Sequence, residues 1–206
     1  MKYEMIIFDM DGTLWDTTDI TLEATNNIAE KYSIVDEVNI DQVKCIMGLS
    51  KEEGAATLMP NLSLDLSTHY IDLQIEEVVR LIKEKGARIY DGVIDTLKKL
   101  SNTYKLAIVT NNKDEYAKIF IDKSNLRNYF TDYMGAASYN ITKGEAIKKL
   151  IDRNNITKAC YIGDIKKDME SAYEAGIDFI HARYGFEPDL VCDKHIDDIR
   201  ELKDLL

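Results

Sequence analysis

Two aspartates, Asp9 and Asp11, stand two residues apart directly after a short apolar segment, and Gly12 follows them. Two ionised carboxylates at close range repel each other, so such a pair is costly unless a cation or a shared proton compensates. A single aspartate after a strand is more often a turn former or a helix cap than a catalytic group. The other polar residues of the sequence must therefore show whether this pair forms a polar turn or part of a reactive site.

Polar residues also follow two later apolar segments of the chain. Thr110 and Asn111 end one of them, Asp164 ends the other, and Asp168 follows four residues later. Lys143 opens a helical stretch that precedes the second segment. Ligands of open α/β sheets bind beyond the carboxyl ends of the strands, so we expect all these side chains at one edge of a sheet. A purely structural explanation fits each residue singly but not the ordered set.

This set of residues favours phosphoryl transfer. Clustered carboxylates without cysteine or histidine prefer a hard cation, and Mg²⁺ is the usual choice beside a phosphate. The cation makes several ionised carboxylates tolerable together, and Lys143 adds further positive charge. Thr110 and neighbouring backbone N–H groups can hold phosphoryl oxygens. Positioning and charge neutralisation of this kind account for most of the catalysis in phosphoryl transfer.

The elements that must position these residues alternate along the chain. Apolar segments without polar alternation indicate buried strands of a parallel sheet, at residues 5–9, 106–110, 159–163 and 177–182, with a weaker candidate at 133–136. Apolar residues at helical spacing predict helices between them, at 92–100, 115–123, 144–151 and 167–175. This order predicts an α/β fold with a doubly wound, Rossmann-like parallel sheet.

One long segment interrupts the alternation. Residues 17–87 contain no convincing strand and indicate several helices, at about 19–32, 40–47, 50–58 and 65–85. A structureless loop of that length is improbable, so we expect a small all-helical domain inserted after the first strand. The predicted domains are a Rossmann-like catalytic core of residues 1–16 and 88–206 and a helical cap of residues 17–87.

Composition narrows the function classes. The 206 residues carry a formal net charge of -11, which argues against nucleic acid and anionic membranes as partners. The three cysteines form no CxxC pair, so neither a zinc site nor a disulfide framework is indicated. The start of the chain lacks the apolar region of a signal peptide, and we expect a cytoplasmic protein. We expect a small-molecule phosphate ester as its partner, and a monomer or weak homodimer.

The motifs in this order resemble the haloacid dehalogenase superfamily. The resemblance rests on DMDGT at 9–13, TN at 110–111, Lys143 and GDxxxD at 163–168. The stretches FDMDGTLWDT and YIGDIKKDMESAYEAGI are similar to the phosphoglycolate phosphatase and β-phosphoglucomutase branch, in which a helical cap follows the first motif. The resemblance implies a strand order of 5-4-1-2-3 in the core and a mobile cap of about four helices.

The resemblance also implies a role for each residue. Asp9 would be the nucleophile that forms an aspartyl-phosphate, and Asp11 would protonate the leaving group and then activate water. The metal ligands would be Asp9, Asp164 and the backbone carbonyl of Asp11, with Asp168 in support. The phosphate-binding and substrate-binding residues would be Gly12, Thr110, Asn111, Lys143 and, in the cap, Lys51.

The leading hypothesis is a magnesium-dependent phosphatase that hydrolyses a small soluble phosphomonoester, a haloacid dehalogenase-like phosphoric monoester hydrolase. The alternative is a β-phosphoglucomutase-like sugar phosphomutase, which would share the same core residues. A phospho-receiver signalling domain also uses aspartates, threonine and lysine with magnesium, but it is shorter and lacks a helical insert. A catalytically inactive relative is disfavoured because all motif residues are present.

Overall fold

The computed structural model of the chain describes residues 2–33 and 36–206. The chain forms two compact units, one made of Met1–Trp15 and Ile89–Leu206, the other of Asp16–Arg88. No helix among the described residues is long and apolar enough to cross a membrane.

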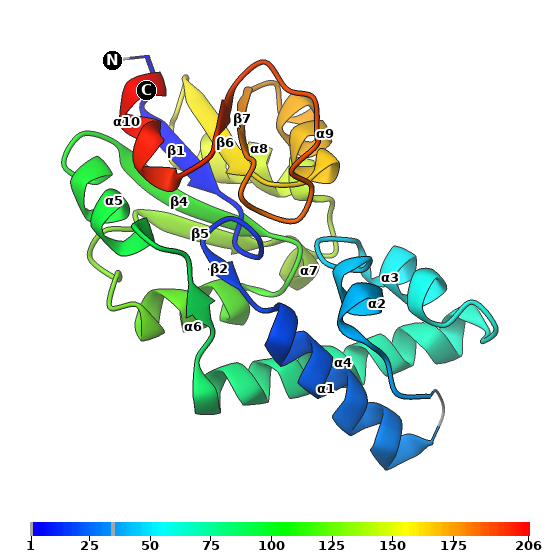
Figure 1. Cartoon of the computed structure of the whole chain (residues 1–206). Coiled ribbons are helices and arrows are strands. Elements are labelled where there is room, and N and C mark those ends of the chain that lie inside the picture. Colours follow the sequence, from blue (N-terminus) through cyan, green and yellow to red (C-terminus); the bar gives the residue numbers. More distant parts are fainter. Residues whose placement is uncertain (1, 34–35) are drawn as a thin grey trace. The chain divides into compact units, whose positions relative to one another are not determined.

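The larger unit is built on a parallel sheet in the order β5-β4-β1-β6-β7-β8 (Figure 1). Its strands are β1 (Met5–Phe8), β4 (Lys105–Thr110), β5 (Asp132–Gly135), β6 (Ala159–Gly163), β7 (Asp178–Ala182) and β8 (His195–Ile196). The predicted α/β fold is confirmed. The five predicted strands are, in chain order, β1, β4, β5, β6 and β7, so the implied order 5-4-1-2-3 corresponds to β7-β6-β1-β4-β5 and is confirmed as well. The two-residue edge strand β8 was not predicted, because it is too short to show an apolar pattern.

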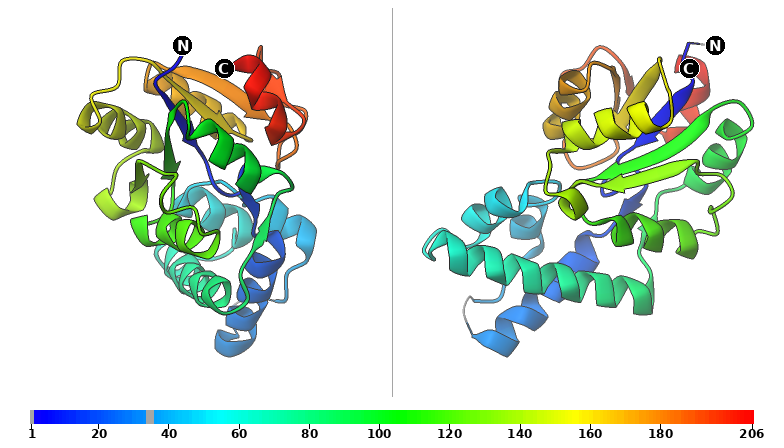
Figure 2. Two further views of the ribbon diagram at one scale, coloured as in Figure 1. Left: turned by 90° about the vertical axis from the view of Figure 1, so that its left-hand side faces the viewer. Right: turned by 180° about the vertical axis from the view of Figure 1, so that it is seen from behind.

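The central strands are apolar throughout because both faces of the sheet are covered. All four residues of β1 are buried, and β4 and β6 are buried almost throughout. Apolar residues of α8 (Lys143–Arg153) and α9 (Lys166–Glu174) pack with alternate residues of these strands on one face. Figure 2 shows α5 (Val93–Leu100) and the C-terminal α10 (Leu202–Leu205) on the opposite face. Helix α6 (Asp114–Lys123) contacts β4 and β5, and the short helix α7 (Ala136–Tyr139) follows β5.

The smaller unit is helical, as the sequence predicts for this segment. It contains α1 (Thr18–Tyr32), α2 (Ile40–Lys44), α3 (Lys51–Leu58) and the long α4 (Leu64–Lys85). Helix α4 contacts both α1 and α3, and the side chains between them form a small apolar core of Ile28, Ala55, Met59, Tyr70 and Ile71.

The chain passes between the units through a short two-stranded sheet, which consists of β2 (Trp15–Asp16) and β3 (Arg88–Ile89). Asp16 accepts a hydrogen bond from the backbone of Thr18 at 2.9 Å, at the start of α1, and pairs with Arg88 at 2.7 Å. These contacts give Asp16 a structural role where the helical insert begins and ends.

The helix that carries Lys143 begins at a capping box. Thr142 accepts from the backbone N–H of Glu145 at 3.1 Å, and the Glu145 carboxylate accepts from the backbone N–H of Thr142 at 2.9 Å. These bonds satisfy backbone donors that the first turn of a helix leaves without partners. The capping box therefore fixes the start of α8, and with it the backbone of Lys143.

Substituting Thr142 tests the cap. We expect Thr142→Ala to lower the free energy of unfolding by about 1 kcal/mol, because the first turn of α8 loses its side-chain acceptor. Urea unfolding of the full chain measures the effect, and Thr142→Ser, which keeps the hydroxyl, is the matched control. Equal stability of the alanine and serine variants would contradict the assignment.

Candidate active site

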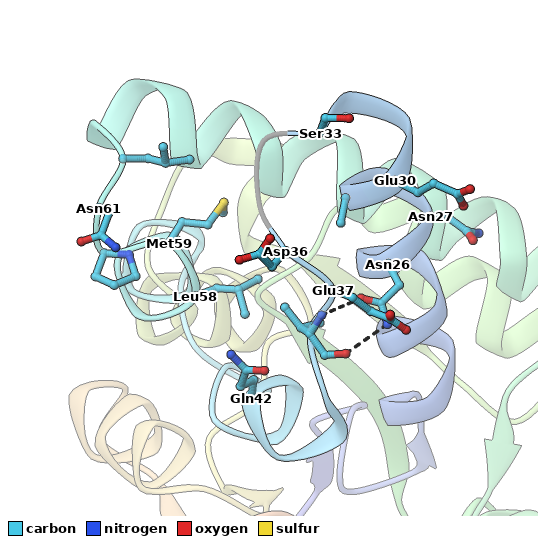
Figure 3. A pocket seen from close by; sticks show the side chains of 14 residues that line it. Asn26, Asn27, Glu30, Ser33, Asp36, Glu37, Gln42, Leu58, Met59 and Asn61 are labelled. Carbon is cyan, nitrogen blue, oxygen red and sulfur yellow. Dashed lines mark hydrogen bonds between the residues drawn. The ribbon is translucent and has the colours of Figure 1, made fainter.

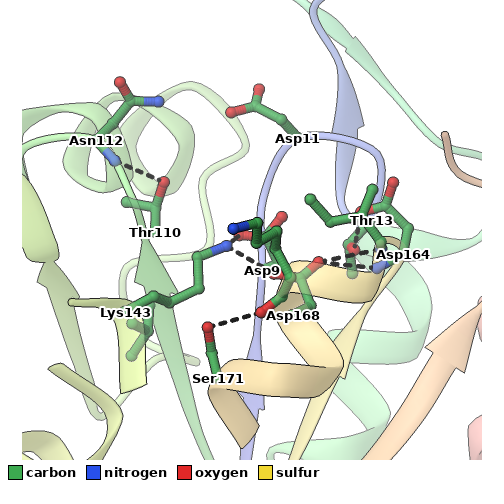
Figure 4. Close-up of polar contacts among 12 residues, drawn as sticks. Asp9, Asp11, Thr13, Thr110, Asn112, Lys143, Asp164, Asp168 and Ser171 are labelled. Atoms are coloured by element: carbon green, nitrogen blue, oxygen red, sulfur yellow. Dashed lines mark hydrogen bonds and ion pairs between the residues drawn. The ribbon is translucent and has the colours of Figure 1, made fainter. Parts of the chain in front are cut away.

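The carboxylates predicted to converge do so at the carboxyl ends of β1 and β6. Asp9 directly follows β1, Asp164 directly follows β6, and Asp168 lies in the first turn of α9. Each of the three offers a carboxylate oxygen within 4.8 Å of the other two, and all three are buried. Figure 4 shows them side by side beneath the loop that carries Asp11.

Lys143 is the cation of this cluster. Its Nζ lies 2.8 Å from Oδ1 of Asp9 and 2.7 Å from Oδ1 of Asp168, and its side chain is only 4% exposed. Burial lowers the pKa of Lys143, but the charges of Asp168 and Asp9 outweigh burial and raise it above its usual value. The lysine is therefore an ammonium ion at neutral pH, held between two carboxylates.

The site remains short of positive charge. Three ionised carboxylates against one ammonium would leave two uncompensated negative charges in a buried cluster. Burial and the charge of Asp168 raise the pKa of Asp9 to about 7, although Lys143 opposes them. Burial, with the charges of Asp168 and Asp9, raises the pKa of Asp164 well above its usual value. A hard divalent cation bound by these oxygens would remove the deficit, so the residues fit magnesium.

Asp168 also shapes the backbone around the cluster. One of its oxygens, Oδ2, accepts from the backbone N–H groups of Asp164 and Ile165 at 3.1 and 3.3 Å. A Cβ on Gly163 would lie 2.5 Å from the Cβ of Asp168, so only glycine permits this close approach. The GDxxxD spacing therefore folds the first turn of α9 back onto the end of β6.

Thr110 is the last residue of β4, and Asn111 follows it at the same edge of the sheet. Thr110 is buried, and its hydroxyl accepts from the backbone N–H of Asn112 at 3.2 Å. A hydroxyl that accepts one bond can still donate its own proton, so Thr110 can bind an anionic oxygen. Asn111 is half-buried beside it.

Asp11 lies in the loop after β1, and its carboxylate is outside the group formed by Asp9, Asp164 and Asp168. The loop is closed by backbone bonds from Thr13, Leu14 and Trp15 to the carbonyl of Met10. Gly12 has a φ of +85° at this turn. The predicted ligation of a metal by Asp11 involves its backbone carbonyl, so it does not depend on this side chain.

Lys51, the substrate-binding candidate of the cap, is the first residue of α3. Ser50 caps the helix, and Lys51 pairs with Asp72 of α4 at 3.1 Å. Both side chains of the pair are exposed at 37% and 52%, so Lys51 can exchange this partner for another anion at low cost. Its role in substrate binding stays a prediction.

Several contacts of the site were not anticipated from the sequence. Thr13 donates to Asp164 at 3.0 Å, and the backbone N–H of Phe186 donates to the same carboxylate at 2.8 Å. The buried Tyr161 donates to the carbonyl of Val109 at 2.8 Å and lies 3.4 Å from Asp9. Thr13 could have been found from the sequence, because it belongs to the DMDGT motif. Phe186 could not, because it acts through its backbone N–H, and Tyr161 could not, because a tyrosine in an apolar strand looks like an ordinary core residue.

The helical unit contains a cavity of its own, of about 810 Å³ (Figure 3). Its lining includes Glu30, Asp36 and Glu37, with Asn26 hydrogen-bonded to both backbone groups of Val38. None of the predicted catalytic or metal-binding residues lines it.

Comparison with known proteins identifies the family. The model of the haloacid dehalogenase-like hydrolase family matches residues 6–182. The chain belongs to the haloacid dehalogenase-like hydrolase family. Its sequence is 28% identical to a phosphoglycolate phosphatase of Aliivibrio fischeri, over 93% of this chain and 92% of the relative. It is also 28% identical to a phosphorylated carbohydrates phosphatase of Thermotoga maritima, over 86% and 84% of the two chains.

A solved haloacid dehalogenase-like structure supports the fold of this family. The chain resembles a hydrolase of the family from Streptococcus pneumoniae with a TM-score of 0.85, over 99% of this chain and 98% of that one, at 23% sequence identity. The predicted superfamily, the α/β core and the enzyme class, a haloacid dehalogenase-like phosphatase, are confirmed.

Gly12 offers a test of how tightly the loop fits the cluster. A Cβ at Gly12 would lie 2.0 Å from Oδ2 of Asp164, in addition to the strain of a positive φ. At Gly176, which has a φ of +75°, a Cβ would meet no atom within 4 Å among the described residues. In urea unfolding, we expect Gly12→Ala to be more destabilising than Gly176→Ala by about 1–3 kcal/mol, because only the first adds overpacking. Equal losses in the two variants would contradict this packing.

Proposed function

We propose that the chain is a magnesium-dependent phosphatase that hydrolyses a small phosphomonoester through an aspartyl-phosphate, an acyl phosphate formed on Asp9. The observation that carries the proposal is the buried contact of Lys143 with Asp9 and Asp168 at the carboxyl ends of the strands. The names of the curated relatives, phosphoglycolate phosphatase and phosphorylated carbohydrates phosphatase, favour phosphate release from a small organic phosphate.

In the first step, a carboxylate oxygen of Asp9 attacks the phosphorus, and the bond to the leaving oxygen breaks. Lys143 favours the ionised form of Asp9 that attack requires, and its charge attracts the phosphoryl oxygens. Thr110 and the backbone of Asn111 orient the phosphoryl group. Asp11 gives its proton to the leaving oxygen, so that an alcohol departs rather than an alkoxide.

In the second step, Asp11 takes a proton from a water molecule that attacks the phosphorus of the acyl phosphate. The bond between phosphorus and Asp9 breaks, inorganic phosphate is released, and the Asp9 carboxylate is restored. Magnesium would be held by Asp9, Asp164 and the Asp11 carbonyl, with Asp168 in support, and when bound it supplies positive charge for the phosphoryl oxygens.

The helical unit would act as the cap that excludes bulk water and recognises the leaving group. Lys51 is our candidate contact for an anionic part of the substrate, because its present partner Asp72 is exposed.

Release of phosphate tests the proposal. With Mg²⁺, the protein should hydrolyse p-nitrophenyl phosphate and at least one member of a panel that contains 2-phosphoglycolate and hexose phosphates. Absence of phosphate release from every substrate would contradict a phosphatase, and interconversion of hexose phosphate isomers without phosphate release would indicate the mutase instead.

The nucleophile can be tested with one substitution and one control. We expect Asp9→Asn to lower kcat about 1000-fold or more, because an amide cannot form the covalent intermediate. Asp193→Asn changes the same functional groups at an exposed position and should leave kcat within about twofold of the unmodified protein, as is usual for surface substitutions. A rate for Asp9→Asn equal to that of the control would show that Asp9 is not the nucleophile.

A further inference from the structure

The carboxylate of Asp11 has a hydrogen-bond donor that the sequence did not indicate. The hydroxyl of Tyr116 donates to Oδ1 of Asp11 at 2.9 Å. Tyr116 lies in the first turn of α6, which follows the loop of Thr110 and Asn111, and it is only 4% exposed. The bond therefore joins the Asp11 loop to the helix that follows the loop of Thr110 and Asn111.

The ring of Tyr116 is fixed by Trp15. The two rings meet edge to face, with their centroids 5.4 Å apart and an angle of 74° between them. Trp15 is itself buried and closes the Asp11 loop, since its carbonyl accepts from the backbone N–H of Gly12 at 2.9 Å. The buried ring, packed edge to face on Trp15, thus directs its hydroxyl to Asp11.

The direction of this hydrogen bond matters for a carboxyl group that carries a proton. A protonated carboxyl group has one oxygen that accepts and one that bears hydrogen. Because Tyr116 donates to Oδ1, a proton on Asp11 would be carried by Oδ2. The attacking and leaving oxygens lie on opposite sides of the phosphorus, so the acid has to stand apart from the nucleophile. The Asp11 carboxylate meets this requirement, because it lies outside the group of Asp9, Asp164 and Asp168.

We propose that Tyr116 is a positioning residue for the acid Asp11, which it holds with Oδ1 as acceptor and Oδ2 as the site of the transferable proton. The inference rests on the proposed phosphatase function. When the ester bond to phosphorus breaks, the proton of Oδ2 passes to the leaving oxygen, and the carboxylate that results still accepts from Tyr116. The contribution is largest for alkyl phosphates, since an alkoxide needs this proton more than a nitrophenolate does.

Two substrates and two variants test the inference. Tyr116→Phe removes only the hydroxyl and keeps the ring that packs on Trp15. The matched control is Tyr3→Phe, because Tyr3 is equally buried and its hydroxyl donates to Asp178 at 2.5 Å. That bond lies at the start of β7, at the edge of the sheet opposite the proposed site. The substrates are p-nitrophenyl phosphate and the alkyl phosphate that the unmodified protein hydrolyses fastest.

The readout is the ratio of kcat/KM for the alkyl phosphate to kcat/KM for p-nitrophenyl phosphate. We expect this ratio to fall about tenfold in Tyr116→Phe, the size typical of a lost hydrogen bond to a charged group, and to stay unchanged in Tyr3→Phe. An unchanged ratio in Tyr116→Phe, or an equal fall in both variants, would overturn the inference. Failure of the unmodified protein to hydrolyse either substrate would instead overturn the proposed function.

Discussion

The buried ion pairs of Lys143 with Asp9 and Asp168 are the interaction on which the site depends. Removing one partner of such a pair leaves an uncompensated buried charge, which typically costs about 3–5 kcal/mol. Here the lysine faces a cluster of three carboxylates, so it compensates only part of their charge. Burial, together with the charges of the neighbouring carboxylates, raises the pKa values of Asp9 and Asp164. The remaining deficit of positive charge fits a divalent cation at this cluster.

The fold supplies the geometry that this cluster requires. Parallel strands deliver Asp9, Thr110 and Asp164 to one edge of the sheet, and α8 begins there with Lys143. The loop after β1 can approach Asp164 closely because position 12 is glycine. The space beside Asp164 has no room for a Cβ at that position. Binding energy at such a site is directed to the phosphoryl group, which all phosphate esters share, so specificity has to come from the residues that contact the leaving group.

The sheet and the main residues of the site could be predicted from two signals in the sequence, namely short apolar runs and the polar motif residues at their ends. Buried parallel strands such as 5–9 and 159–163 are short apolar runs, and the motif residues follow them directly. The small elements were missed for a physical reason. Strand β8 has only two residues and lies at the edge of the sheet, and β2 and β3 have two residues each, so none of them shows a periodic pattern.

The supporting contacts of the site were harder to foresee. Phe186 contributes a backbone N–H, which any residue type provides, and Tyr116 and Tyr161 look like core aromatics until their hydroxyls are placed. The sequence suggests which groups react, because their chemistry restricts the residue type. It does not indicate which neutral groups orient them, because many residue types can fill those positions.

Calorimetric titration of the full chain with Mg²⁺ tests most directly whether the buried carboxylate cluster, only partly balanced by Lys143, forms a cation site. We expect one saturable site in the unmodified protein, with binding lost in Asp164→Asn and retained in Asp193→Asn. Absence of magnesium binding in the unmodified protein, or undiminished binding in Asp164→Asn, would contradict this assignment.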